Sequence, residues 1–313
     1  MTTNAIQVNQ LTKKYGSFFA LNNLSFSVPE GKVCGFLGPN GAGKTTTINL
    51  ILSLSRPTAG SISVFDHTVP DDLDWILKQV GVSLERPPFY PFLSGQDNLY
   101  YLAVIRGKHI VERIPNVLQA VGLEEEAWRK PVKTYSQGMR QRLALAAALL
   151  PDPRLFILDE PMNGLDPYGM AETRELILHW CHDQSKTVFL SSHLLGEMEQ
   201  ICDYFLIIHK GQLLAQGNKE YVKGPGEKLC GIQTSMVEKA REFLCSQNVW
   251  VAPWSKSGDT IWYTVSSEAD SLAVLQRLTE EGVSINGNAS LNNSLEGVFM
   301  ALTRGIGLPN KRA

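Results

Sequence analysis

A glycine-rich stretch that leads into a lysine and two threonines has the spacing of a loop that holds the phosphates of a nucleotide. It consists of Gly38, Pro39, Asn40, Gly41, Ala42, Gly43, Lys44, Thr45 and Thr46. The small residues let the backbone curl around an anion, and we expect the loop amides to point at phosphate oxygens. Lys44 is expected to reach the β- and γ-phosphates, and Thr45 to bind Mg²⁺ through its hydroxyl. A glycine-rich turn without a ligand is the alternative.

An acidic pair, Asp159 and Glu160, is the second group that could do chemistry. It follows the apolar run 155–158, which is typical of a central parallel strand covered on both faces. Such strands end at the edge where ligands lie, so we expect Asp159 to face the magnesium ion and Glu160 to polarise the attacking water. A solvated acidic turn is the alternative, and the phosphate loop favours catalysis.

The elements that must position these groups follow from the apolar pattern. Residues 33–37 indicate a buried strand and residues 45–54 a helix, which is the context that a phosphate loop requires. Upstream, residues 6–8 and 25–28 alternate as half-buried antiparallel strands do.

A third motif lies between the loop and the acidic pair. It runs from Tyr135 to Arg142, contains Ser136 and Gly138, and precedes the apolar helix 143–150. With this motif, residues 6–217 resemble the ATP-binding subunits of ATP-binding-cassette (ABC) transporters. The resemblance implies that the signature of one subunit closes on the γ-phosphate held by the other, so Ser136 and Gly138 would complete the partner's site. It therefore implies a homodimer that forms on ATP binding.

The same resemblance gives roles to three further residues. Tyr15 would stack on adenine, Asp166 would lie in a loop that crosses the dimer interface, and His193 would contact the γ-phosphate. Each has a simpler alternative, namely a turn residue for Tyr15, a helix cap before Pro167 for Asp166, and a structural histidine for His193.

The chain also departs from the family pattern. Glu85 stands where most cassettes carry a glutamine that ligates Mg²⁺ and senses the membrane partner, and a carboxylate also suits that ion. Tyr135, Gln137 and Met139 replace the usual signature residues. Both departures are similar to those in the exporters that give self-protection against lantibiotics and bacitracin.

Length and composition predict two parts. The chain has 313 residues, of which 43% are hydrophobic, enough for one large and one small core. For 1–220 the resemblance implies an α/β P-loop NTPase cassette with an antiparallel β subdomain, including a helical subdomain at about 71–150. A Gly-Pro-Gly break at 224–226 then introduces a small α+β accessory domain over 221–313. In it we expect helices near 237–244 and 272–278, strands at 260–265 and 283–285, and a terminal element at 295–300.

Several features bear on partners. The net charge of −2, without a dense basic stripe, argues against nucleic acid. Five cysteines without paired spacing fit a reducing compartment, and no apolar run approaches the roughly 20 residues of a membrane helix. A separate integral-membrane permease would therefore form the pore, with this chain cytoplasmic and peripheral on the inner face of the membrane. The aromatic loop 86–91 lies where the family receives a permease helix, although packing within the chain is equally expected.

Two other groups have a structural interpretation. Trp250, Trp254 and Trp262 could line a pocket, but core packing is favoured. Residues 179–183, His-Trp-Cys-His-Asp, resemble metal ligands, but without a convergent partner in the sequence we expect the solvated end of a helix.

The sequence thus predicts an ATPase, with ATP and Mg²⁺ as its ligands, that powers an ABC exporter for a peptide antibiotic or drug. A soluble cassette acting on ribosomes or DNA is the alternative of another class, but those types carry two cassettes or a long coiled coil. A regulatory cassette that binds ATP without turnover remains open because of the altered signature. The transported molecule cannot be read from this chain.

Overall fold

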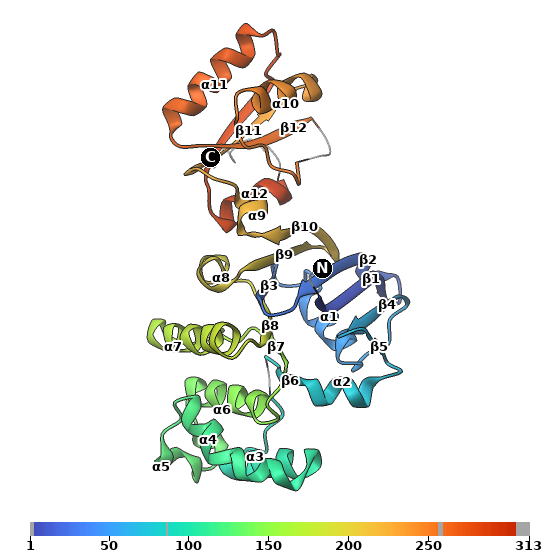
Figure 1. Ribbon diagram of the computed structural model, residues 1–313, viewed down its shortest axis with the longest axis vertical. Helices are drawn as coiled ribbons and strands as arrows, with labels where there is room; N and C mark the ends of the chain where they lie inside the picture. Colours follow the sequence, from blue (N-terminus) through green and yellow to red (C-terminus); the bar gives the residue numbers. More distant parts are fainter. Residues whose placement is uncertain (1–2, 86, 256–258, 305–313) are drawn as a thin grey trace.

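The computed structural model describes residues 3–85, 87–255 and 259–304. Its centre is a six-stranded sheet in the order β10-β9-β3-β8-β7-β6 (Figure 1). The strands are β3 (Val33–Leu37), β6 (Val80–Ser83), β7 (Leu155–Asp159), β8 (Thr187–Ser192), β9 (Tyr204–His209) and β10 (Gln212–Asn218). Neighbours are parallel except β9 and β10. Every residue of β3, β7 and β8 is buried, as their apolar runs predict.

A four-stranded antiparallel sheet in the order β2-β1-β4-β5 lies beside the central one. Its strands are β1 (Asn4–Tyr15), β2 (Phe18–Pro29), β4 (Ala59–Val64) and β5 (His67–Val69). The ring of Phe26 lies 5.5 Å from that of Phe36, which in turn lies 5.4 Å from Phe189. These aromatic contacts join the two sheets and confirm the predicted α/β fold with an antiparallel β part.

Helices cover the sheet and form a lobe at one end, where α3 to α6 gather (Figure 1). They are α1 (Lys44–Ile51), α2 (Leu73–Gln79), α3 (Gly95–Arg106), η1 (Lys108–Arg113), α4 (Ile114–Ala120), α5 (Glu125–Trp128), η2 (Val132–Thr134), α6 (Gln137–Leu149), α7 (Pro167–Leu178), η3 (His179–Asp183) and α8 (Leu195–Ile201). In the described part of the chain, no helix combines the length and the apolar character needed to cross a membrane.

The predicted solvated helix end at 179–183 is wrong for its central residues. The segment η3 is a π-helical turn in which Trp180 and Cys181 are buried. The Trp180 ring stacks on Phe156 of β7, with centroids 4.2 Å apart and planes 10° from parallel. This contact draws the end of the helix onto the sheet.

The last part of the chain is α+β, with a three-stranded antiparallel sheet in the order β12-β11-β13. Its elements are α9 (Lys219–Lys223), β11 (Lys228–Gln233), α10 (Val237–Ser246), β12 (Thr260–Val265), α11 (Glu268–Glu280), β13 (Gly287–Asn292) and α12 (Leu295–Arg304). The strand predicted at 283–285 is wrong, because Val283 closes the end of α11 by donating from its amide to Leu278. The third strand follows at 287–292, with only every second residue half-buried.

The C-terminal part packs against the rest of the chain. The tryptophan interpretation is confirmed, since Trp262 is buried and Trp250 and Trp254 pack on the same apolar cluster. That cluster also contains Leu295 of α12 and Met198 of α8. The boundary near residue 220 stays a prediction.

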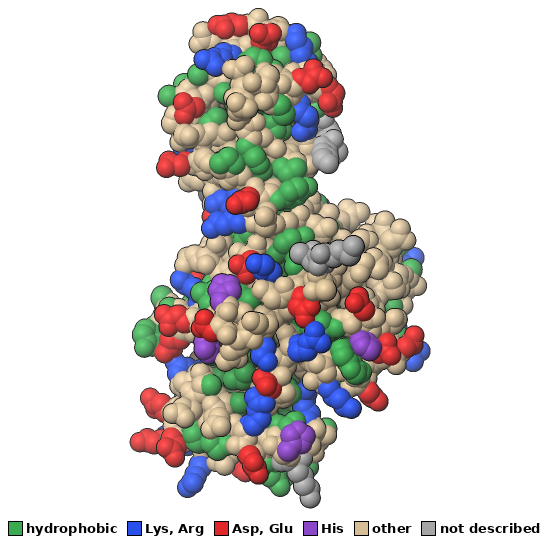
Figure 2. All heavy atoms as spheres, viewed as in Figure 1, with side chains coloured by type: hydrophobic (Ala, Val, Ile, Leu, Met, Phe, Trp, Pro, Cys, Tyr) green, Lys and Arg blue, Asp and Glu red, His purple; other side chains and the backbone are tan. Residues whose placement is uncertain are grey.

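Acidic and basic side chains are interspersed on the visible face of the molecule (Figure 2).

Candidate active site

The phosphate loop joins β3 to α1 and requires glycine where its backbone turns most tightly. Gly41 and Gly43 have φ values of 79° and 111°, which other residues rarely adopt. A Cβ atom on Gly38 would lie 2.4 Å from the carbonyl oxygen of Ile208. The amides of the first turn of α1 have no partner within the helix, so they are available to an anion at its N-terminus.

Lys44, the first residue of α1, is buried with only 6% of its surface exposed. Its Nζ donates to the carbonyl oxygen of Gly38 at 2.7 Å and lies 3.1 Å from Oε1 of Glu160. The second oxygen of Glu160 lies 2.8 Å from Nδ1 of His193. Lys44, Glu160 and His193, which the sequence separates widely, therefore form one contiguous group.

Asp159 and Thr45 also meet. Thr45 Oγ1 donates to Asp159 Oδ2 at 3.1 Å, and Ser191 Oγ donates to Asp159 Oδ1 at 2.5 Å. Burial raises the pKa of Asp159, hydrogen bonds from Ser191 and Thr45 lower it, and the charges of Glu160 and Glu85 raise it, with an upward net direction. A hydroxyl and carboxylates supply the hard oxygen donors that suit Mg²⁺.

The parallel sheet explains this convergence. Leu37, Asp159 and Ser192 end the adjacent strands β3, β7 and β8. The phosphate loop, Glu160 and His193 therefore emerge side by side at the carboxyl edge, where ligands bind in such sheets. Glu160 has a left-handed backbone, φ 52°, and its amide hydrogen bonds to Ser191 hold it there.

A cavity of about 510 Å³ opens over this edge. Its lining comprises Tyr15, Phe18, Ala20, Pro39, Asn40, Gly41, Gly43, Lys44, Thr45, Thr46, Glu85, Glu160, Asn163 and His193. Tyr15 is half exposed, and Lys13 Nζ lies 4.8 Å from the centre of its ring. The cavity thus brings together most of the predicted residues, with Glu85 at a position shared with a neighbouring hollow.

Sequence reasoning missed three lining residues, Phe18, Ala20 and Asn163. Phe18 pairs with Tyr15 across the β1–β2 turn, so an aromatic three residues after Tyr15 was the available signal. Asn163 lies three residues beyond the acidic pair, where a polar side chain could have drawn attention. Ser191, which donates a hydrogen bond to Asp159, could have been suspected because it lies two residues before His193.

Ser136, Gly138 and Asp166 lie outside this cavity. Ser136 caps α6 by accepting a hydrogen bond from the Met139 amide at 3.2 Å, and Gly138 follows in the first turn. Asp166 caps α7 by accepting from the Gly169 amide at 2.9 Å, as its alternative interpretation predicts. A single chain does not bring these residues to its own phosphate loop.

Comparison with known sequences gives consistent relatives. Residues 21–163 match the profile of the family described as ABC transporter. The bacitracin transport ATP-binding protein BcrA of Bacillus licheniformis is 38% identical over 300 residues, covering 96% of this chain and 97% of that protein. The lantibiotic transport ATP-binding protein SrtF of Streptococcus pyogenes is 38% identical over 216 residues, covering 69% of this chain and 91% of that protein.

Solved structures show the same fold. An ATP-binding subunit of an ABC transporter is 30% identical, with a TM-score of 0.63, and covers 70% of this chain and 92% of its own. The dimeric ABC transporter cassette MJ0796 has a TM-score of 0.63 at 24% identity, and the match covers 68% of this chain and 98% of that one. The cassette fold predicted from the sequence is therefore confirmed.

Proposed function

Because this chain belongs to the ABC transporter family of ATP-binding proteins, we propose that it hydrolyses ATP to power an exporter whose pore is a separate permease. The observation that carries the proposal is the contiguous group of Lys44, Glu160 and His193 beside the phosphate loop. It supplies a cation for the phosphates, a base for water and a partner that orients the base, which are the parts that phosphoryl transfer needs.

Each group has a distinct role in the proposal. The loop amides and Lys44 bind the β- and γ-phosphates, and Tyr15 stacks on adenine. Thr45, Asp159 and Glu85 would hold Mg²⁺, which neutralises charge on the phosphate oxygens. Glu160 accepts the proton of the attacking water, and His193 Nδ1, 2.8 Å away, keeps its carboxylate in place.

The site needs a second copy to be complete. Ser136 and Gly138 at the start of α6 present a hydroxyl and helix amides to solvent, away from the cavity of their own chain. In a two-fold dimer these groups would cap the γ-phosphate of the partner, with Asp166 in the interface. The dimeric state of MJ0796 is a property of that protein and is consistent with this arrangement.

An apolar hollow, distinct from the nucleotide cavity and from the hollow beside Glu85, supports a membrane partner. It has a volume of about 470 Å³ and is lined mainly by apolar residues from β6, α3, α6 and the segment 87–90. Of the predicted loop 86–91, residue 86 lies outside the described residues. Ile105 is 82% exposed and Tyr101 53% exposed at this hollow, so an apolar helix of the permease would gain by covering them. We propose that the chain binds the cytoplasmic face of the membrane through such a partner.

The proposed substrate class comes from the relatives named for bacitracin and lantibiotic transport. The test is to identify a membrane protein that co-purifies with the chain and to reconstitute both in vesicles. We expect ATP-dependent movement of a peptide antibiotic, abolished by Glu160→Gln. Hydrolysis without transport would contradict the exporter, and nucleotide binding without hydrolysis would instead identify the regulatory cassette.

A further inference from the structure

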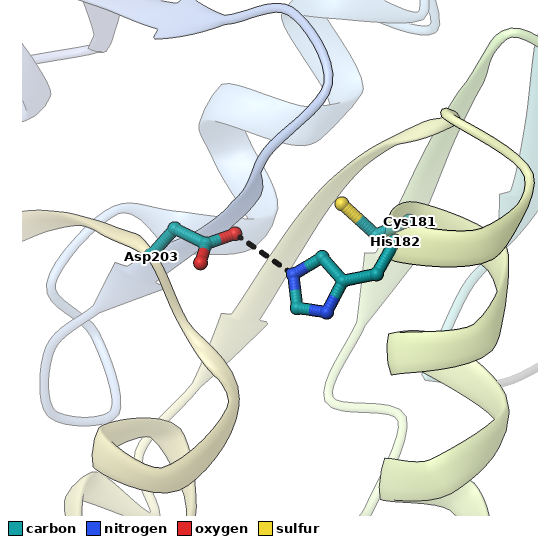
Figure 3. A group of neighbouring side chains, drawn as sticks. All are labelled: Cys181, His182 and Asp203. Atoms are coloured by element: carbon teal, nitrogen blue, oxygen red, sulfur yellow. Dashed lines mark ion pairs between the residues drawn. The ribbon is translucent and has the colours of Figure 1, made fainter.

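A cysteine, a histidine and an aspartate converge at the edge of the sheet opposite the phosphate loop (Figure 3). Cys181 and His182 come from η3, and Asp203 comes directly before β9. One ligand atom from each lies within 4.8 Å of the other two, and His182 Nε2 is 3.5 Å from Asp203 Oδ2. Asp203 is the convergent metal-ligand partner of residues 179–183 that could not be identified from the sequence.

This cluster is separate from the nucleotide site. Asp203 Oδ2 accepts a hydrogen bond at 2.9 Å from the amide of Val33, the first residue of β3. The phosphate loop begins after Leu37, the last residue of the same strand. At ~3.3 Å per residue the two ends of β3 are roughly 13 Å apart. An ion at the cluster would therefore not touch the phosphates.

We propose that Cys181, His182 and Asp203 bind a Zn²⁺ ion, with water as the fourth ligand. A thiolate, an imidazole and a carboxylate are the donors that Zn²⁺ takes in tetrahedral sites, whereas Mg²⁺ and Ca²⁺ prefer oxygen alone. The rest of the chain already restrains the segments that carry these three ligands. The Val33 amide orients the carboxylate, and the stacked Trp180 fixes the turn that carries Cys181 and His182.

Accessibility also fits an ion that enters from solvent. Cys181 is buried, whereas the side chains of His182 and Asp203 are 52% and 31% exposed. Burial raises the pKa of Cys181 to about 11, the charge of Asp203 adds to this, and Lys32 opposes it. The free thiol therefore carries its proton at neutral pH. Binding forms the Sγ–Zn bond and releases that proton to solvent, with no change of oxidation state.

Such an ion would cross-link three segments of the cassette. It would join η3, which leads into β8, to the start of β9, and through Asp203 to the start of β3. The phosphate loop and His193 follow the opposite ends of β3 and β8. The bound ion would therefore stabilise the two strands that position the nucleotide site. Its expected effect is a higher melting temperature in Zn²⁺.

Co²⁺ is the probe for the experiment, because a thiolate ligand gives it a charge-transfer band that oxygen ligands do not give. We expect the purified full chain to bind one equivalent with this band, and Zn²⁺ to displace it. Cys181→Ser should abolish the band. His182→Ala and Asp203→Asn should each weaken Zn²⁺ binding by at least roughly tenfold. Asn at 203 can still accept from the Val33 amide.

Two controls separate this site from others. Cys245→Ser removes an exposed cysteine elsewhere and should leave the band unchanged. Asp159→Asn alters the proposed magnesium site and should also leave it unchanged. The half-exposed His182 keeps the test valid should Cys181→Ser fail to fold. An unaltered band in Cys181→Ser, undiminished Zn²⁺ affinity in His182→Ala, or no thiolate band at one equivalent would overturn the proposal.

Discussion

Lys44 and Glu160 form a buried ion pair, with Nζ 3.1 Å from Oε1 and side-chain exposures of 6% and 8%. The pair lies in the cavity where we place the phosphates. The γ-phosphate would therefore compete with Glu160 for Lys44, and binding would free the carboxylate to face water. The same two residues thus link nucleotide binding to the readiness of the catalytic base.

This pair predicts opposite effects of two substitutions. Lys44→Ala should abolish productive ATP binding, because it removes a cation and leaves the buried Glu160 without its lysine partner next to the phosphates. Glu160→Gln should bind ATP at least as tightly as the native chain while turnover falls by about 100- to 10,000-fold, since a general base is lost. Nucleotide affinity and phosphate release, measured separately, check both. An equal loss of binding in the two variants would contradict these roles.

Tyr15 should act on the base and not on the phosphates. Removal of an aromatic that stacks on a base costs about 1–3 kcal/mol, so Tyr15→Ala should weaken ATP binding by roughly 5- to 150-fold. Binding of tripolyphosphate, which has no base, should be unchanged. Phe92→Ala is the matched control, because Phe92 is an exposed aromatic that does not line the cavity. Equal losses for ATP and tripolyphosphate would refute the stacking role.

Glu85 should matter more for transport than for nucleotide affinity. It lines both the nucleotide cavity and the hollow that contains Gln137 and Pro87, whereas Lys44 and the loop amides remain to hold the phosphates. Glu85→Ala should therefore lower transport more than ATP affinity. Both are measured in vesicles with the permease, with the exposed Glu238→Ala as control. Normal transport by the Glu85→Ala variant would show that Glu85 is a surface carboxylate with no role in transport.

Local sequence signals predicted the parts of the site that local geometry controls. The phosphate loop depends on glycines within nine residues, and the apolar runs before it and before Asp159 specify strands buried on both faces. Parallel strands then place their carboxyl ends together, so the meeting of Thr45 with Asp159 follows from topology.

Contacts between distant segments could not be predicted in this way. Phe18 and Asn163 reach the cavity only because the β1–β2 turn and the segment after β7 lie next to the loop. Val283 and Ile285 are apolar because they pack on the C-terminal core from a connection, so their pattern imitates a strand. Cys181 and His182 meet Asp203 only when β9 lies beside β3.

Glu199 of α8 should anchor the C-terminal helix in a pH-dependent manner. Burial raises the pKa of Glu199, but hydrogen bonds from Lys223 and the Leu295 amide outweigh it and hold the pKa below its usual value. The stabilisation is therefore present above the unfolded pKa of about 4.3 and is lost as the pH falls through the folded pKa.

Glu199→Gln should accordingly lower the free energy of unfolding by roughly 1 kcal/mol at pH 7. The difference in melting temperature from the native chain should shrink below about pH 4. Glu238→Gln, an exposed glutamate on α10, should show no difference. A gap between Glu199→Gln and the native chain that persists in acid would contradict a charged anchor.

The most direct test of the account is the ATP-dependent assembly of the Glu160→Gln chain, followed by light scattering. A ligand shifts an equilibrium only through contacts that differ between states, and the γ-phosphate would gain Ser136 and Gly138 only in the dimer. We predict a monomer in ADP, a two-fold dimer with two nucleotides in ATP, and no dimer when Ser136→Arg is added. Ser136→Asn, which keeps the cap of α6, serves as the folding control. An ATP-dependent dimer that persists in the Ser136→Arg double variant would contradict a site completed by the partner.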